Sequence, residues 1–316
     1  MNFTNSQLIS FSKPVSDTEE TKCKKAISMI SNALKNKGFS EIQDIKLSFS
    51  NTNAYETRLK KDSREIKLLV QGSYANNTNV RASSDVDVAV IQEDVFYTEY
   101  RSGIAKEDYG FTSSNYSARQ YKKDIYDDLT NYFGSGNVLW NNKCLSIEGN
   151  GYRADSDAVP ARRNRDYTSD YRRDTENYIS GICIVPDLGD PVINYPEQHI
   201  ENGRNKNNAT NSYYKKNVRI LKKIRYLMKD NGIISADKVS SFMLESLLWN
   251  IPNNIFIADE NYLDRFKRII NYIKANNNWN TYKEANGIKA LCKDETEKSN
   301  MTSFFRDLDA FFEPAD

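Results

Sequence analysis

The chain has 316 residues, of which 39% are hydrophobic and 28% are charged. This length allows one large core or two modest domains, and the composition is that of a folded protein rather than a disordered one. The 44 basic and 43 acidic residues give a net charge of +1. Proteins that coat nucleic acids usually carry a strong basic excess, so we expect no stable nucleic-acid partner.

The sequence also gives expectations for the cellular location of the protein and for structural zinc sites and disulfides. The first residues are polar and are interrupted by Pro14, which is not the pattern of a secretory signal. Apolar runs stay shorter than eighteen residues, so we expect a cytoplasmic protein without a membrane partner. The four cysteines are scattered, and His199 is the only histidine. We therefore expect reduced thiols rather than a structural zinc site or a set of disulfides.

The first part of the chain predicts one helix followed by short strands. Residues 17–37 have apolar side chains at helical spacing, with Ser16 or Asp17 as the N-cap and Gly38 as the stop. Residues 44–68 are ambiguous. Beyond them, strands are expected at 66–70, 85–91, 137–140, 144–147, around 154–161 and at 181–185.

From about residue 210 the chain is predicted to be mostly helical. The Asn-rich stretch 201–212 is interpreted as a hinge loop. The change from strands to helices predicts an α+β fold, with one domain over 1–200 and a helical domain over 201–316 that closes the active-site cleft.

The strongest chemical signal is a D-x-D pair in a strand. Asp85 and Asp87 lie two residues apart, so their side chains share one face, with Cα atoms about 6.6 to 6.8 Å apart. The valines of this run, Val86, Val88 and Val90, point to the other face, where a core would need them. Two such carboxylates favour Mg²⁺, particularly with a phosphate-bearing substrate. The alternative for D-x-D alone is a solvated strand face.

The context of this pair carries a family resemblance. The stretch QGSYANNTNVRASSDVDVAV places a Gly72-Ser73 corner, whose N–H groups can point at phosphate, before the two aspartates. It resembles the polymerase-β-like nucleotidyltransferase superfamily. More narrowly, it resembles the bacterial cyclic-oligonucleotide synthases (CD-NTases), relatives of animal cyclic GMP-AMP synthase and oligoadenylate synthase. The resemblance implies a polymerase-β-like core with a mixed β-sheet, packed against a C-terminal helical bundle.

The same resemblance implies the remaining site residues. The segment RADSDAVPA offers Asp157 as the third metal-binding acid, with Asp155 as its rival. Gln71, Gly72 and Ser73 belong to the implied nucleotide-binding set. The helical half adds three residues to that set: Lys222 for the triphosphate, Ser241 for a phosphate and Phe242 for stacking on the base.

Two of these helical residues have structural alternatives. Phe242 is equally well explained by burial in the core. Lys222 also belongs to a basic stripe with Lys215 and Arg219, which on its own would be a solvated helix face. His199 is interpreted as structural rather than as a general base.

The resemblance also implies a reaction. Asp85, Asp87 and Asp157 would hold two Mg²⁺ ions, with Mn²⁺ as a substitute, and would catalyse nucleotidyl transfer from NTPs, ATP among them, with release of pyrophosphate. Repetition of this step would close a ring of two or three nucleotides. The product would be a second messenger of anti-phage signalling (CBASS) that acts on a separate effector protein.

Two other functions remain open at this point. One is a polymerase-β-like enzyme that modifies an RNA, a protein or a small molecule. The other is a degenerate fold that only binds nucleotides or partners, and the presence of all three acids argues against it.

Overall fold

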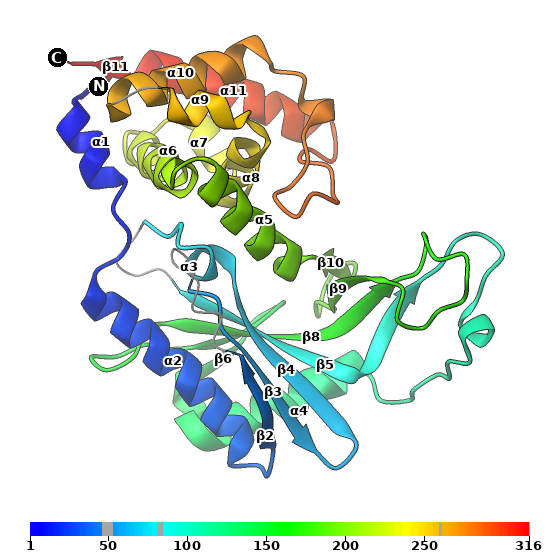
Figure 1. The fold of residues 1–316 in the computed structure, drawn as a ribbon. Helices are drawn as coiled ribbons and strands as arrows, with labels where there is room; N and C mark the ends of the chain where they lie inside the picture. Colours follow the sequence, from blue (N-terminus) through cyan, green and yellow to red (C-terminus); the bar gives the residue numbers. More distant parts are fainter. Residues whose placement is uncertain (46–52, 81–84, 259–260, 316) are drawn as a thin grey trace. The chain divides into compact units, whose positions relative to one another are not determined.

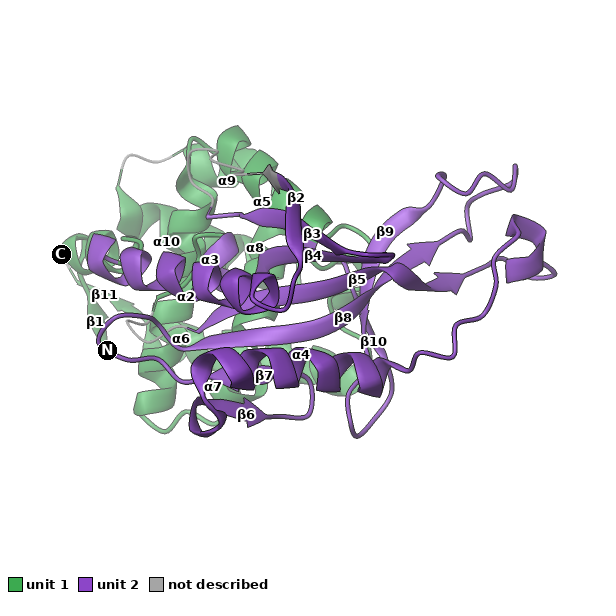
Figure 2. Ribbon diagram, turned by 90° about the horizontal axis from the view of Figure 1, so that it is seen from below, with its two compact units in different colours: residues 1–15, 76–82, 197–316 green, residues 16–75, 83–196 purple. Residues whose placement is uncertain are grey.

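The structure is a computed structural model that describes residues 1–45, 53–80, 85–258 and 261–315. The chain forms two compact units (Figure 2). The sheet unit comprises residues 16–75 and 83–196, and the helical unit comprises residues 1–15, 76–82 and 197–316. The predicted boundary between residues 200 and 201 lies close to the last crossing of the chain from one unit to the other, while two short earlier segments also group with the helices.

The sheet unit is built on a mixed β-sheet, as predicted (Figure 1). Its main strands follow the order β10-β9-β8-β5-β4-β3-β2, in which β5 and β8 run parallel and the other neighbours are antiparallel. The short β6 and β7 form a hairpin whose β7 pairs with the start of β8. The strands are β2 (Ser40–Ile45), β3 (Glu56–Lys61), β4 (Arg64–Gln71), β5 (Val86–Glu99), β6 (Val138–Trp140), β7 (Leu145–Ile147), β8 (Ser156–Asp166), β9 (Ile179–Ile184) and β10 (Val192–Asn194).

Two helices, α2 (Asp17–Lys35) and α4 (Ala118–Phe133), lie side by side on one face of this sheet (Figure 2). The cap of α2 is Ser16, one of the two predicted, whose hydroxyl accepts the N–H of Glu19. The valines of the D-x-D strand are buried, as predicted, and the hydroxyl of Tyr121 on α4 donates to the carbonyl of Val90 at 3.1 Å. Asp87, which alternates with these valines, therefore points away from the helices.

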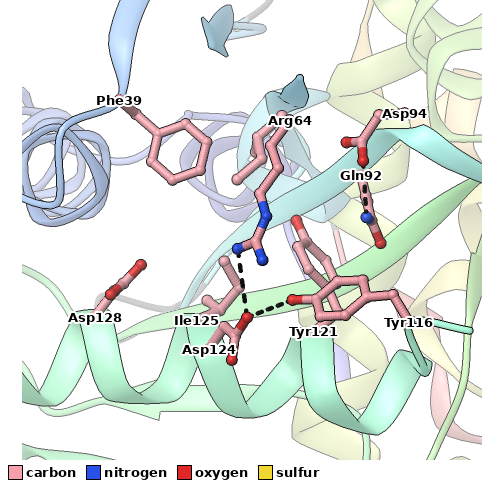
Figure 3. Close-up of a pocket in the computed structure, with 10 residues that line it drawn as sticks. Phe39, Arg64, Gln92, Asp94, Tyr116, Tyr121, Asp124, Ile125 and Asp128 are labelled. Carbon is pink, nitrogen blue, oxygen red and sulfur yellow. Dashed lines mark hydrogen bonds and ion pairs between the residues drawn. The ribbon is translucent and has the colours of Figure 1, made fainter. Parts of the chain in front are cut away.

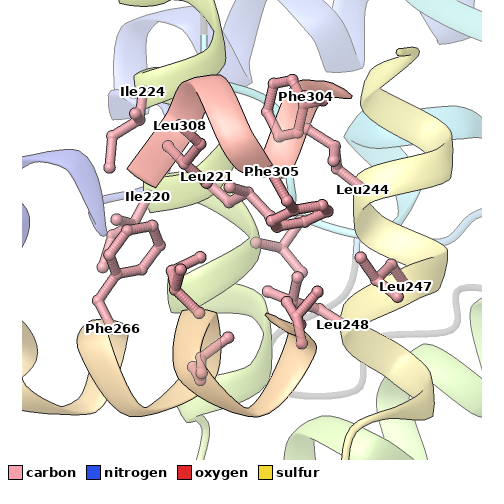
Figure 4. Packing of buried hydrophobic residues seen from close by; sticks show 14 of the residues in the cluster. Ile220, Leu221, Ile224, Leu244, Leu247, Leu248, Phe266, Phe304, Phe305 and Leu308 are labelled. Carbon is pink, nitrogen blue, oxygen red and sulfur yellow. The ribbon is translucent and has the colours of Figure 1, made fainter. Parts of the chain in front are cut away.

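The helical unit has its own apolar core, where α6, α8, α10 and α11 meet (Figure 4). Side chains such as Leu221, Leu248 and Phe304 are fully buried there. The helices are α1 (Asn5–Phe11), α5 (Pro196–Ala209), α6 (Tyr213–Asp230), α7 (Ser235–Lys238), α8 (Ser241–Asn250), α9 (Asn253–Ile257), α10 (Tyr262–Ala275) and α11 (Glu295–Phe311), with β1 (Asn2–Phe3) and β11 (Glu313–Pro314) paired in parallel at the ends of the chain. Among the described residues, none of the helices is long and apolar enough to cross a bilayer.

The predicted hinge loop over 201–212 is wrong for most of its length, because residues up to Ala209 belong to α5. Pro196 suits the first turn of a helix, and the side chain of Asn207 is buried and accepts the N–H of Lys215 at 3.1 Å. These tertiary contacts outweigh the weak helix propensity of asparagine. The break lies instead at Asn211 and Ser212, whose φ angles of 50° and 64° are left-handed.

A buried polar network in the helical unit is centred on Glu245 of α8. Its carboxylate contacts Lys222 Nζ at 2.5 Å, Thr78 Oγ1 at 2.7 Å and His199 Nε2 at 3.0 Å. Burial alone would raise the pKa of Glu245, but the charge of Lys222 and the hydrogen bond from His199 hold that pKa well below its ordinary value. The carboxylate is therefore ionised and compensated inside the unit, and His199 has the structural place expected of it.

We predict that Glu245→Ala destabilises the helical unit by about 3–5 kcal/mol, because it leaves Lys222 as a buried charge without its carboxylate. The loss is measured as a fall in the midpoint of thermal or urea unfolding. Because the pKa of Glu245 is lowered in the folded state, its contribution is present near neutral pH and fades as the pH falls below the ordinary glutamate value.

The matched control is Asp309→Asn, which breaks the exposed Lys274–Asp309 pair of the same unit, 2.6 Å long. An exposed pair contributes at most about 1 kcal/mol. If the two substitutions lowered the unfolding midpoint equally, the network around Glu245 would contribute no more to stability than an exposed ion pair.

Candidate active site

Three acidic residues meet where β5 and β8 begin. Asp87 lies directly opposite Asp157 in the register of these two parallel strands, whose backbones are about 4.8 Å apart. Asp85 immediately precedes β5, and the N–H of the following Val86 donates to the carbonyl of Asp155 at 3.1 Å. The strand pairing therefore gathers Asp85, Asp87 and Asp157 at one end of the sheet.

The electrostatics show that these acids interact strongly. Burial, then the charge of Asp157 and then that of Asp85, raise the pKa of Asp87 to about 7. The pKa of Asp85 is raised by burial first and then by Asp157 and Asp155. Because neighbouring carboxylates disfavour ionisation of Asp85 and Asp87, a cation bound beside them would relieve the repulsion.

The donor set fits a divalent cation of the Mg²⁺ type. Carboxylate oxygens are the ligands that Mg²⁺ prefers, and this ion keeps several waters and takes phosphate oxygens of the substrate rather than a complete protein cage. Within the described part of the chain, no three Asp, Glu, His or Cys side chains are arranged so that they could hold a metal ion by themselves. Asp87 and Asp157 share a face of the sheet, and a cation there would need further ligands such as water or substrate phosphates.

A glycine corner lies against these acids. Gln71, the last residue of β4, is opposite Asp87 in the antiparallel register, and Gly72 then turns the chain into the short α3 (Gly72–Ala75) with a φ of 70°. A Cβ atom on Gly72 would lie 2.2 Å from Oδ2 of Asp87. Only glycine permits this backbone to approach the carboxylate. The half-buried Ser73 follows within α3.

The two rival candidates for the third acid have different surroundings. Asp157 lies within β8 and accepts a hydrogen bond of 2.5 Å from the hydroxyl of Ser146 on β7. Asp155 precedes β8 and is exposed, and its carboxylate accepts the N–H of Gly149 at 2.6 Å. The register with Asp87 therefore favours Asp157, while Asp155 holds a loop.

The other predicted nucleotide-binding residues belong to the helical unit. Lys222 is 3% exposed and pairs with Glu245 and Thr78, so the basic stripe of α6 is not a solvated face. Ser241 begins α8, and its hydroxyl lies 3.5 Å from that of Tyr226. Phe242 keeps 39% of its surface exposed, with its ring edge-on to His199, so it is not a core residue. Their contacts with a nucleotide remain predictions.

Sequence reasoning did not single out Ser146 and Glu245, which contact the predicted site residues Asp157 and Lys222. Ser146 lies in a segment recognised as a strand, but its partner Asp157 becomes visible only through the register of β7 with β8. Glu245 lies in the same predicted helix as Ser241 and Phe242. A single acidic residue among apolar ones in a helix could have indicated a buried, paired carboxylate.

A small pocket elsewhere in the sheet unit is separate from the acids. It opens between β4, β5 and α4 on the helix-covered face, where Arg64, Tyr116 and Asp124 form a hydrogen-bonded group (Figure 3). Asp128 also lines it, and burial raises the pKa of Asp128 to about 6. None of the three acids of the candidate site lines this pocket.

The mixed sheet, the glycine corner and the paired acids define a nucleotidyltransferase, and the comparisons with known proteins agree. Residues 53–130 match the nucleotidyltransferase domain family. Residues 201–313 match the C-terminal helical domain of cGAS/DncV-like nucleotidyltransferases.

Individual relatives narrow the class. The cyclic GMP-AMP synthase CdnE03 of Staphylococcus schleiferi is 42% identical over 99% of this chain and 98% of its own length. The solved c-UMP-AMP synthase CdnE of Rhodothermus marinus, bound to Apcpp and Upnpp, has a TM-score of 0.77 and 28% identity and covers 97% of this chain and 95% of its own. The CdnE cyclic dinucleotide synthase of Elizabethkingia meningoseptica, with GTP and Apcpp, has a TM-score of 0.71 and 32% identity over 97% of this chain and 99% of its own. The chain belongs to the CdnE family of cyclic nucleotide synthases.

We predict that Gly72→Ala lowers nucleotidyl transfer by about 100-fold or more, because its methyl group must displace the carboxylate of Asp87 and misplacements near 1 Å have effects of this size. The measurement is pyrophosphate release from NTPs.

Gly103→Ala is the control. Gly103 also has a positive φ, of 79°, but an added Cβ there meets no atom within 4 Å. It should keep activity, and a Gly72→Ala enzyme as active as this control would contradict the close approach at the corner.

Proposed function

We propose that this enzyme makes a cyclic dinucleotide from two NTPs, with ATP as one substrate and GTP as the first candidate for the other. The observation that carries the reaction is the register of Asp87 with Asp157 beside the glycine corner. The choice of product is supported by the relative named a cyclic GMP-AMP synthase, which matches nearly the whole chain. The alternative product is a cyclic trinucleotide, which differs from a cyclic dinucleotide in mass.

Asp85, Asp87 and Asp157 are the residues that would hold two Mg²⁺ ions, with Mn²⁺ as a substitute. When bound, these ions supply charge stabilisation on the phosphates and a lower pKa of the attacking hydroxyl. The strand pairing sets the backbones of Asp87 and Asp157 side by side, and the absence of a side chain at Gly72 leaves room for the carboxylate of Asp87. In each transfer the acceptor ribose oxygen bonds to the α-phosphorus of the donor and pyrophosphate leaves.

Other residues of the chain would bind the substrates. Gln71, the N–H groups of the Gly72 corner and the Ser73 hydroxyl are proposed to contact the donor phosphates. In the helical unit, Lys222 and Ser241 are proposed to contact the triphosphate, and the exposed ring of Phe242 is proposed to stack on a base.

The biological role that we propose is anti-phage signalling of the CBASS type in the cytoplasm, where NTPs are available. In this role the cyclic product leaves the enzyme and activates a separate effector protein. Support for this step comes from membership of the CdnE family.

The product is tested by incubation of the enzyme with all four NTPs and Mg²⁺, without any other acceptor. We expect a product that resists phosphatase and has the mass of a cyclic dinucleotide containing AMP, as read by mass spectrometry. Transfer that requires an added RNA, protein or small molecule would instead show an enzyme that modifies such an acceptor.

We predict that Asp87→Asn and Asp157→Asn each abolish product formation, because each removes a negative charge that the cations require. The control is Asp127→Asn, whose exposed carboxylate pairs with Lys123 on α4 at 2.5 Å. Asp127→Asn should keep full activity. If Asp87→Asn still forms product, the proposed catalytic role of Asp87 is wrong and the reaction must take place at another site.

A further inference from the structure

The β6–β7 hairpin brings a hydroxyl group within hydrogen-bond distance of Asp157, the third acid of the candidate site. Ser146 of β7 lies opposite Asp157 of β8 in their antiparallel register, and its Oγ donates to Asp157 Oδ1 at 2.5 Å. A hydrogen bond between a hydroxyl and a carboxylate is among the stronger and more directional contacts in proteins. One oxygen of Asp157, Oδ1, therefore has Ser146 as a fixed hydrogen-bond donor, and the Cys144 thiol is a second side-chain partner of the same carboxylate.

The direction of this hydrogen bond is fixed by a second one. The side-chain amide of Asn141 donates through Nδ2 to Ser146 Oγ at 2.7 Å. An NH₂ group can only donate and an ionised carboxylate can only accept, so Ser146 Oγ accepts from Asn141 and gives its one hydrogen to Asp157. The thiol of Cys144 lies 3.8 Å from Ser146 Oγ and is the weaker partner. The contacts form a chain with one polarity, from Asn141 through Ser146 to the carboxylate.

The turn that carries Asn141 is itself anchored to a helix. Lys122 of α4, with a side chain 5% exposed, donates through Nζ to the carbonyl of Asn141 at 2.5 Å and to that of Asn142 at 3.1 Å. The same ammonium pairs with Asp187 at 2.6 Å. The turn that carries Asn141 therefore has a buried, charged anchor on α4.

We propose that Ser146 is a positioning residue for Asp157: its hydroxyl, oriented by Asn141, holds the carboxylate in the orientation that binds the catalytic cation. This inference rests on the proposed function. The terminal torsion of an aspartate is broad, so a carboxylate without such a partner samples orientations that do not bind the ion. Partners that orient metal ligands in this way typically contribute about 10- to 100-fold to metal affinity or activity.

The test compares Ser146→Ala with Ser146→Thr, which keeps a hydroxyl, and with Ser114→Ala. The control removes the hydroxyl of an exposed serine, which accepts the N–H of Tyr116 at 3.2 Å and lies outside the site. Mn²⁺ binding is measured by electron paramagnetic resonance of the free ion in the presence of a non-hydrolysable ATP analogue. The same proteins are assayed for kcat, KM and thermal midpoint.

We expect Ser146→Ala to weaken Mn²⁺ binding about 10-fold or more and to lower kcat by a similar factor, with little change in KM or in the thermal midpoint. Ser146→Thr should restore most of both losses, and Ser114→Ala should match the wild type. Ser146→Ala with wild-type Mn²⁺ binding would overturn the inference and leave the proposed function intact. A large fall in the thermal midpoint of Ser146→Ala, or failure of Ser146→Thr to rescue, would make Ser146 a structural contact. A wild-type protein that neither binds Mn²⁺ nor makes product would overturn both proposals.

Discussion

The candidate site depends on the parallel pairing of β5 with β8. This pairing places Asp87 opposite Asp157, although two carboxylates at neighbouring positions repel each other. The arrangement persists because the other sides of the same strands are buried, as the fully covered Val88 and Ala158 show. A slip of one residue would turn the apolar side chains outward and bury the acids, so the hydrophobic core fixes the position of the charges.

The residues around the acids accommodate these close carboxylates in different ways. Gly72 contributes by having no side chain, since any Cβ would meet the carboxylate of Asp87. Ser146 contributes a donor to Asp157, and the buried Lys122 holds the hairpin from which that donor comes. The acids form an unfavourable cluster of like charges, and the residues around them accommodate it. Such a local conflict with the requirements of folding is expected at a functional site.

Much of the site was predictable because its signals are local in sequence. The alternation around Asp85 and Asp87 predicted both the strand and its buried face, and the resemblance of the flanking segments named the family that the comparisons confirm. The contacts of Ser146 and Glu245 were not predictable, because their partners lie on other elements and depend on register and packing. The hinge expected at 201–212 failed for a similar reason: composition indicated a loop, while tertiary contacts of side chains such as Asn207 stabilise a helix.

Lys222 shows how one residue can serve both the fold and the proposed reaction. The segment 76–82, between the glycine corner and the aspartates, belongs to the helical unit, where Thr78 shares the carboxylate of Glu245 with Lys222. An ammonium has three N–H donors, and in the described part of the chain Lys222 uses two of them, for Glu245 and Thr78. If Lys222 binds the triphosphate as proposed, a phosphate oxygen would take the third donor and leave the buried pair intact. On this view Glu245 fixes the ammonium in advance, so a triphosphate that binds it need not offset the entropy of ordering a long, flexible side chain.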